Sequence, residues 1–361
     1  MPEADRSNRT QRVSVVPGVL DNRRQMDDAC PIRTSVDSRQ RVSTRPIDAS
    51  GTCTALGLGM RPWHHRIRPW GPRMQQPVIV ALDGSDKDAR AIAVATAIAN
   101  LSECDLHFVR VIHPAPEHLA GSVAAFGLRD AVAIGRQEAE VQLADAVATV
   151  PSRPGHAVTS AVLAGKDVAG ELIRHAVERD AFALVLASRA PGTAERAIIG
   201  SVADRVVRES PRPVVIAPPG TVFMAGKQLT LTRVLVPLDG SSLAFRSLEF
   251  LIELPHAKEL EYVLIEVVPA RHDRLASEAR LQSTARWLRA RGATSVEVVV
   301  LESGNAAAAI LAAVREVLPT AIAMSTRGTS GLGRMVLGSV ADAVVRGSEL
   351  PVLLLTPKVL G

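Results

Sequence analysis

The feature of this sequence that most constrains its fold is an internal repeat. PVIVALDGS over residues 77–85 recurs as RVLVPLDGS over 233–241, an offset of 156 residues. GSVADRVVRESPRPVVI over 200–216 recurs as GSVADAVVRGSELPVLL over 338–354, an offset of 138 residues. The 18-residue difference between these offsets falls between the second and third predicted strands. Each copy therefore has the size of one domain, and the chain is a tandem repeat.

Each copy alternates short apolar runs with helical stretches. The runs of the first copy span 78–82, 106–112, 158–163, 183–187 and 213–216, and those of the second span 234–238, 262–268, 296–301, 321–325 and 352–355. Because the runs are continuously apolar rather than alternating, they predict strands buried on both faces of a parallel sheet.

Helical periodicity fills the gaps between these runs. The apolar positions of two such helix faces are Val94, Ala97, Ile98 and Leu101 in the first copy, and Leu311, Val314 and Leu318 in the second. Parallel strands need helical crossovers of this kind. The sequence predicts an α/β fold: two tandem doubly wound five-stranded parallel-sheet domains, over 77–218 and 231–357, preceded by a disordered tail.

The basic charge is confined to that tail, residues 1–76. The chain has a formal net charge of +5; the tail holds 13 Arg, no Lys and seven acids, and the rest holds 29 basic and 30 acidic residues. The folded body is therefore near neutral, and we expect no nucleic-acid groove on it. The tail shows no sustained periodicity and is rich in Pro, Gly, Ser, Thr and Arg, which predicts disorder.

Other interpretations of the tail stay open. Its basic stretch 61–73, with two Trp, could contact phosphate or an acidic surface. A transit peptide is disfavoured because such peptides are poor in acids. Met74 could also be the true start of translation, since the first predicted strand begins shortly after it.

The composition excludes several further classes of function. Aromatic residues make up 3%, few for a protein that stacks single-stranded bases. No apolar run is long enough to span a membrane, and no secretory signal opens the chain, so we expect no membrane partner. Three cysteines (Cys30, Cys53 and Cys104) form neither a disulfide framework nor a metal-binding spacing. These observations predict a cytoplasmic protein.

The loops after the strands carry the polar residues that could bind a ligand. In a doubly wound sheet, ligands bind beyond the carboxyl ends of the strands. The first strand of each copy ends in Leu-Asp-Gly-Ser, which places Asp83 and Asp239 there. Asp-Gly is also a common turn pair, and Asp can cap the following helix, so a purely structural role is an alternative.

The loop after the fourth strand leads to a Gly-Ser pair that opens a helix. The pairs are Gly200-Ser201 and Gly338-Ser339. Glycine lets the backbone approach an anion, the free amides at a helix start point at it, and the serine hydroxyl would add a donor and a cap. This is phosphate-binding chemistry without the P-loop sequence or the dinucleotide fingerprint. Arg189 and Arg327 recur in these loops and could reach phosphate or stay solvated.

These ordered features resemble the universal stress proteins, and the two copies resemble a tandem member of that family over about residues 77–357. The family has an adenine-nucleotide α-hydrolase-like fold whose members divide into ATP binders and non-binders. The resemblance implies that ATP, with or without Mg²⁺, is the cofactor. It assigns the base and ribose side to Asp83 and Val111, and to Asp239 and Val267.

The resemblance assigns the phosphate side to Gly200, Ser201 and Val202 in the first copy, and to Gly328, Gly338, Ser339 and Val340 in the second. The first glycine of the family motif is replaced by Ala187 and Ser325, and the second is Ala190 in the first copy. The second copy retains this second glycine as Gly328, so we expect the second copy to be the better binding site.

Two function classes follow. The first is a nucleotide-binding stress-response regulator without fast turnover; the alternative is a slow ATPase or phosphotransferase, which would need a positioned water and a metal held by carboxylates. We expect Cys104 to be a buried structural residue, and His107, His113 and His118 to have no metal or catalytic role because none recurs in the second copy.

The resemblance also bears on assembly. The family pairs domains through the last strand of the sheet, and the runs 213–216 and 351–355 are short apolar edges that invite pairing. We expect an intramolecular pseudo-dimer of the two copies, with a homodimer as a further possibility.

Overall fold

The structure, a computed structural model, describes residues 76–113, 123–188, 199–220, 228–269, 274–326, 337–356 and 359; over 123–131 it defines the helix but not the side chains. The predicted tail, except for its last residue, Gln76, lies outside the described residues. So do the loop positions Arg189, Ala190, Arg327 and Gly328.

The strands follow the predicted runs to within one residue at each end. They are β1 (Pro77–Ala81), β2 (Asp105–Ile112), β3 (Val158–Ala164), β4 (Ala183–Ala187), β5 (Val214–Ala217), β6 (Arg233–Pro237), β7 (Glu261–Val268), β8 (Ser295–Glu302), β9 (Ala321–Ser325) and β10 (Val352–Leu355).

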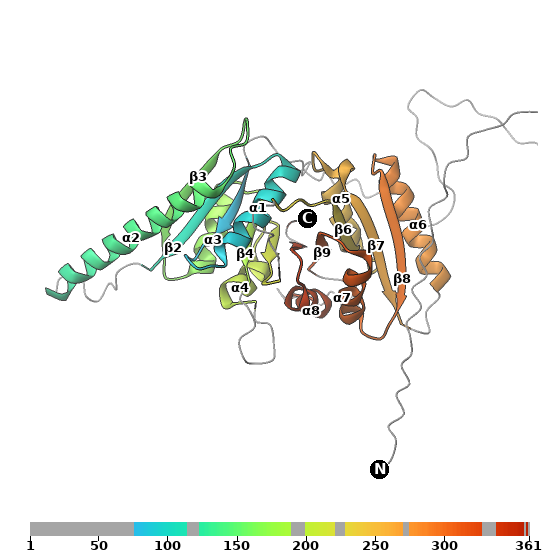
Figure 1. The fold of residues 1–361 in the computed structure, drawn as a ribbon. Helices are drawn as coiled ribbons and strands as arrows, with labels where there is room; N and C mark the ends of the chain where they lie inside the picture. Colours follow the sequence, from blue (N-terminus) through green and yellow to red (C-terminus); the bar gives the residue numbers. More distant parts are fainter. Residues whose placement is uncertain are drawn as a thin grey trace, which may run out of the picture. The chain divides into compact units, whose positions relative to one another are not determined.

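Helices connect the strands as the crossovers of a parallel sheet (Figure 1). They are α1 (Asp88–Ser102), α2 (Val123–Thr149), α3 (Val168–Glu178), α4 (Ser201–Glu209), α5 (Ser242–Ile252), α6 (Arg274–Ala290), α7 (Ala306–Val317) and α8 (Ser339–Gly347), with a 3₁₀ turn η2 (Ala257–Glu259).

The strand order is β3-β2-β1-β4-β5-β10-β9-β6-β7-β8. Strands within each half are parallel, whereas β5 and β10 pair antiparallel, with Val352 opposite Ile216. Each half therefore has the predicted five parallel strands. The reversal of order at β1–β4 and β6–β9 places a crevice beyond the strand ends of each half, where doubly wound folds bind ligands.

Alternate strand residues face two separate hydrophobic cores. Val78 and Val80 of β1 pack on the side of α1 and α2, whereas Ile79 packs on the side of α3 and α4. The second copy repeats this arrangement, with Val234 and Val236 on one side and Leu235 on the other. Burial on both faces explains why the runs lack polar alternation.

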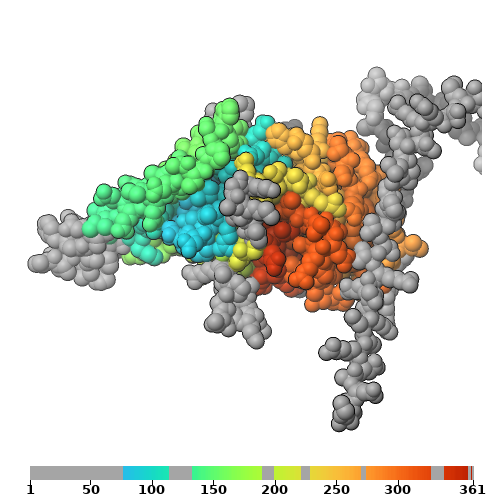
Figure 2. Space-filling model, viewed as in Figure 1, coloured from blue at the N-terminus to red at the C-terminus, as the bar shows by residue number. Residues whose placement is uncertain are grey.

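Much of the length difference between the copies lies in the helix after the second strand. Helix α2 has 27 residues and α6 has 17. In the space-filling view, the green surface of α2 runs along its own copy (Figure 2). The sequence comparison placed this difference correctly.

One apolar position was predicted wrongly. Leu318 is 73% exposed, because α7 ends one residue earlier and Leu318 is its left-handed cap, with φ 48°. The buried face of α7 consists instead of Ala307, Ala309, Ile310 and Ala313. Within the described part of the chain, no helix is both long and apolar enough to cross a bilayer.

Candidate functional site

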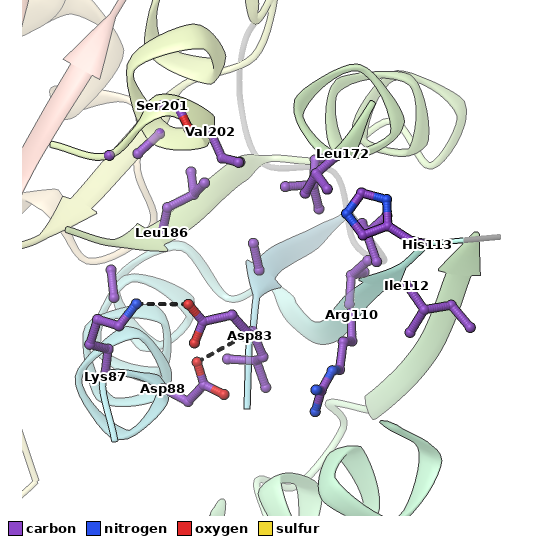
Figure 3. Close-up of a pocket in the computed structure, with 18 of the residues that line it drawn as sticks. Asp83, Lys87, Asp88, Arg110, Ile112, His113, Leu172, Leu186, Ser201 and Val202 are labelled. Carbon is purple, nitrogen blue, oxygen red and sulfur yellow. Dashed lines mark hydrogen bonds and ion pairs between the residues drawn. The ribbon is translucent and has the colours of Figure 1, made fainter. Parts of the chain in front are cut away.

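A cavity of about 570 Å³ lies beyond the carboxyl ends of β1, β2 and β4 in the first copy (Figure 3). Its lining includes all five first-copy residues singled out from the sequence: Asp83, Val111, Gly200, Ser201 and Val202. These residues come from three separate segments of the chain. The fold thus brings the predicted base side and the predicted phosphate side to one cavity.

Asp83 has two roles in the turn that follows β1. Its Oδ1 accepts a hydrogen bond from the Ser85 backbone N–H (3.2 Å), as in an Asx turn, and its Oδ2 forms an ion pair with Lys87 Nζ (2.7 Å). Burial opposes ionisation of this carboxyl, but the hydrogen bonds from Lys87 and Ser85 outweigh it, so the pKa of Asp83 lies below its ordinary value. The carboxylate is charged and already partnered.

Asp88 opens α1 and supports the same turn from the other side. Its carboxylate accepts hydrogen bonds from the backbone N–H groups of Asp83 (3.1 Å) and Gly84 (2.8 Å). Burial raises the pKa of Asp88 despite these two bonds. Gly84 has φ +80°, a conformation that favours glycine, which explains the Asp-Gly pair.

The other side of the cavity is the start of α4. Gly200 is the N-cap with φ +93° and ψ 141°, a region reached almost only by glycine. The first helical hydrogen bond runs from Asp204 N to Gly200 O, so the N–H groups of Ser201, Val202 and Ala203 have no acceptor within the helix. These amides and the helix dipole favour an anion at this point.

The predicted capping role of the serines is wrong. Ser201 and Ser339 are the first helical residues, and the caps are Gly200 and Gly338, with no side-chain cap hydrogen bond. The hydroxyls therefore do not serve the helix start, and only their predicted role toward a ligand remains.

The second copy places its residues at matching points of the fold. Asp239 follows β6 and accepts a hydrogen bond from Ser241 N (3.0 Å), and Val267 lies in β7 beside Glu266. Ser339 and Val340 begin α8. Gly328, the remaining second-copy residue, lies outside the described residues.

The two Gly-Ser pairs differ in backbone conformation. Gly338 has an extended backbone (φ −61°, ψ 146°), and its N–H donates to Thr326 O (2.7 Å). Gly200 has a positive φ. The same dipeptide thus opens the two helices in different ways.

The turns after β1 and β6 also differ in charge. Leu243 and Ala244 stand where the first copy has Lys87 and Asp88. In the second copy Ser241 caps α5 by accepting a hydrogen bond from Ala244 N (3.1 Å). Leu243 cannot form the ion pair that Lys87 forms with Asp83 in the first copy.

Several cavity residues escaped the sequence analysis. Lys87, Asp88, Arg110 and Leu172 line the cavity, as do Val132, Gly135 and Glu138 of α2. His113 lines it too, although we expected no role for it. The sequence search relied on residues repeated in both copies, and the charged ones among these are not repeated.

The remaining candidates are structural. Cys104 is fully buried, and burial raises the pKa of its thiol to about 11, which makes it unreactive as expected. His107 is buried against His175, with 3.0 Å between their Nε2 atoms, away from the cavity lining. His118 lies outside the described residues.

Comparisons with known proteins agree with this fold. The model of the universal stress protein family matches residues 74–218 and 230–356. A curated relative, the "Universal stress protein in QAH/OAS sulfhydrylase 3'region" of Thermus aquaticus, is 29% identical over 143 residues, which cover 40% of this chain and 98% of that protein.

Solved structures show the same likeness. A universal stress protein from Archaeoglobus fulgidus DSM 4304 aligns with a TM-score of 0.58 and 23% identity, over 78% of this chain and 98% of that one. A universal stress protein from Archaeoglobus fulgidus in complex with dAMP covers 40% of this chain and 98% of its own, at 24% identity and a TM-score of 0.29. Because the family model matches both copies, the chain belongs to the universal stress protein family.

Proposed function

We propose that the protein binds adenine nucleotides, ATP in particular, and acts as a stress-response regulator rather than as an enzyme with fast turnover. The observation that carries this proposal is the convergence of Asp83, Val111, Gly200, Ser201 and Val202 on one cavity. Its volume of about 570 Å³ lies in the range of small-molecule sites.

The cavity has two chemically different sides, which suits a nucleotide. The open amides at the start of α4 match a phosphate, and Val111 with the Asp83 turn offers an apolar wall and a carboxylate to a nucleoside. The choice of ATP over other nucleotides follows the family resemblance.

Magnesium, in this proposal, enters with ATP rather than as a resident ion. Among the described residues no group of three or more His, Cys, Asp or Glu is arranged to hold a metal. Asp83 is paired with Lys87, and Asp88 with two backbone amides. Because both aspartates already have partners, they are poorly placed to hold a catalytic metal, which disfavours the alternative of an ATPase or phosphotransferase.

We propose that the second copy binds ATP better than the first. Support comes from the second glycine of the family motif, which the second copy retains as Gly328 and the first copy replaces with Ala190.

We also propose that the two copies form an intramolecular pseudo-dimer through β5 and β10. Supporting contacts are the hydrogen bond from Thr356 Oγ1 to Ser210 O (3.1 Å) and the stacking of Phe182 on Phe250, with ring centroids 5.6 Å apart. A homodimer through the same strands would require β5 to leave β10. Scattering from two independently tumbling domains would contradict the pseudo-dimer.

Calorimetric titration of the full chain with ATP and Mg²⁺ tests nucleotide binding. We expect binding by the natural chain and none by the Ser201→Glu/Ser339→Glu variant, because a carboxylate in the first helical turn repels phosphate while it suits the helix dipole. ATP binding that survives in this variant would contradict the site, and steady-state phosphate release at ordinary enzyme rates would favour the alternative function.

A further inference from the structure

The sheet ends in two outer strands, β3 and β8, and β3 exposes a row of backbone groups. Near the start of β3, Leu106 N donates to Ala157 O at 3.0 Å. Just beyond its end, Gly165 N donates to Ile112 O at 3.0 Å. Because alternate residues of a strand bond the same neighbour, the odd-numbered residues of this segment bond β2. The outward N–H and C=O groups therefore belong to Val158, Ser160, Val162 and Ala164.

The opposite edge of the sheet, strand β8, is protected. Val296 is one of its outward residues, since it stands where β3 has Val158. Its carbonyl oxygen accepts a hydrogen bond from Arg289 Nη2 at 2.6 Å. The strand also carries two glutamates, Glu297 and Glu302. Charged side chains are a common means by which proteins keep an edge strand from pairing.

Strand β3 has no comparable protection. Its seven residues, VTSAVLA, include neither a charged residue nor a proline. Thr159, Ser160 and Ala164 are exposed. Within the described part of the chain, no strand pairs with the outer side of β3. An exposed, uncharged edge of this kind is a template for pairing with another strand.

The symmetry of β3 favours a second copy of this chain as its partner. A two-fold axis relates two identical edges and pairs them antiparallel. With the axis at Ala161, Val158 lies opposite the partner's Ala164. Ser160 then lies opposite the partner's Val162. Every outward N–H and C=O group gains a hydrogen-bond partner, and no like charges meet.

The contrast between the two edges also limits the assembly to two chains. Pairing of β3 with β8 of another chain would build an open filament, but Arg289 occupies the edge of β8. Antiparallel pairing already occurs within the chain, between β5 and β10. A dimer through β3 leaves that pairing intact, whereas a homodimer through β5 would break it.

We propose that the protein forms a two-fold homodimer in which the β3 strands of two chains pair antiparallel about Ala161 and join their sheets. The partner is a second copy of this chain, and main-chain hydrogen bonds of a short uncharged strand make the contact. This inference does not depend on the proposed nucleotide site, because it rests on the outer edge of the sheet.

Sedimentation equilibrium of the full chain tests the dimer, which we expect for the natural chain. Ser160→Pro removes an outward N–H but no hydrogen bond to β2, so the fold should persist. The dissociation constant should rise about thirtyfold, the effect of two hydrogen bonds lost across the axis. Val298→Pro, at the same position of β8, is the matched control and should leave the dissociation constant unchanged. Circular dichroism checks folding, and Ser160→Lys, which adds a charge without altering the backbone, replaces the proline variant if that variant unfolds.

A disulfide tests the register of the two strands. In the proposed dimer Ala161 lies opposite its own copy as a non-hydrogen-bonded pair, with Cα atoms about 4.5 Å apart, which a disulfide can bridge. Ala161→Cys, in a chain that also carries Cys30→Ser and Cys53→Ser, should form a disulfide-linked dimer under mild oxidation. The remaining Cys104 is fully buried and does not interfere. Adding Ser160→Pro should prevent most of this cross-linking.

Three outcomes would overturn the proposal. The first is a natural chain that sediments as a monomer, or a dimer that Ser160→Pro and Ser160→Lys leave intact. The second is a dimer that Val298→Pro weakens as much as Ser160→Pro does, since β3 would then have no special role. The third is a chain with Ala161→Cys that stays dimeric but forms no disulfide, which would exclude antiparallel pairing about this residue.

Discussion

The two copies of the repeat share a fold but differ in the chemistry on it. Their strands, crossover helices and Gly-Ser pairs follow one another in the same order. The site of the first copy contains Lys87, Asp88 and Arg110, and the second has Leu243, Ala244 and Glu266 at these positions. The scaffold is what repeats, and the charged residues on it are what diverge.

The copies also differ at the amino end of the sheet. The first buries His107 and His175 in contact, where the second has Val263 and Ala313. His107 Nδ1 lies 2.7 Å from Thr159 Oγ1. One copy therefore holds titratable groups in a place that is apolar in the other.

The largest expected effect on stability concerns this pair. Burial, reinforced by Arg179, lowers the pKa of His107 to about 4, and burial lowers that of His175. Between pH 6.5 and 4 the unfolded chain binds protons that the folded chain does not, so stability falls as the pH falls, by about 3 kcal/mol from His107 alone. Urea unfolding at pH 7 and pH 4.5 measures this loss.

Replacing both histidines with the residues of the second copy isolates their contribution to the pH dependence of stability. Between these two pH values, the free energy of unfolding of the His107→Val/His175→Ala variant should fall by about 2–3 kcal/mol less than that of the natural chain. His256→Gln is the control, because the hydrogen bond with Glu259 raises the pKa of His256, which gives it the opposite pH dependence. An unchanged acid loss in the His107→Val/His175→Ala variant would contradict the assignment.

The next largest effect concerns the different backbone conformations of the two Gly-Ser pairs. Gly200→Ala forces a Cβ into a positive-φ region and should lower the free energy of unfolding by about 2 kcal/mol. Gly338→Ala, at an extended backbone, should lower it by less than about 1 kcal/mol, because the backbone is not strained and Ala is only a poorer N-cap than Gly. Equal losses in chemical denaturation would mean that the two helix starts do not differ.

The smallest effect concerns the caps of α1 and α5. Ser241→Ala removes the N-cap hydrogen bond of α5 and should cost about 1 kcal/mol. Ser85→Ala should cost less than about 0.5 kcal/mol, because α1 has no side-chain cap and Ser85 only bonds Asp83 at an exposed turn. Thermal unfolding of the matched pair distinguishes them, and equal shifts would contradict the difference.

The sequence predicted the scaffold well because burial on both faces leaves a continuous apolar signature in every strand. It failed at Leu318, where a left-handed residue before Pro319 ended the helix one residue before the expected apolar position. Helix ends depend on single backbone angles, which periodicity does not record.

The five residues predicted for the first copy line one cavity, but the prediction missed other residues of that lining. The comparison of the two copies identified Asp83, Gly200 and Ser201, because these residues recur. It could not identify Arg110 and Gln142, because the second copy has Glu266 and Arg280 at these positions. It also hid Val132 and Gly135, because they lie in the part of α2 that precedes the equivalent of the α6 start. A search for residues common to both copies cannot find the residues in which the copies differ.

The most direct test of the account is the assignment of ATP to one copy. Calorimetric titration with ATP should lose its main binding event in Ser339→Glu and keep it, at nearly unchanged affinity, in Ser201→Glu. Both substitutions occupy the same position in their helices, so the comparison is matched. Loss of ATP binding in Ser201→Glu with retention in Ser339→Glu would show that the working adenine site lies in the first copy and would contradict the account.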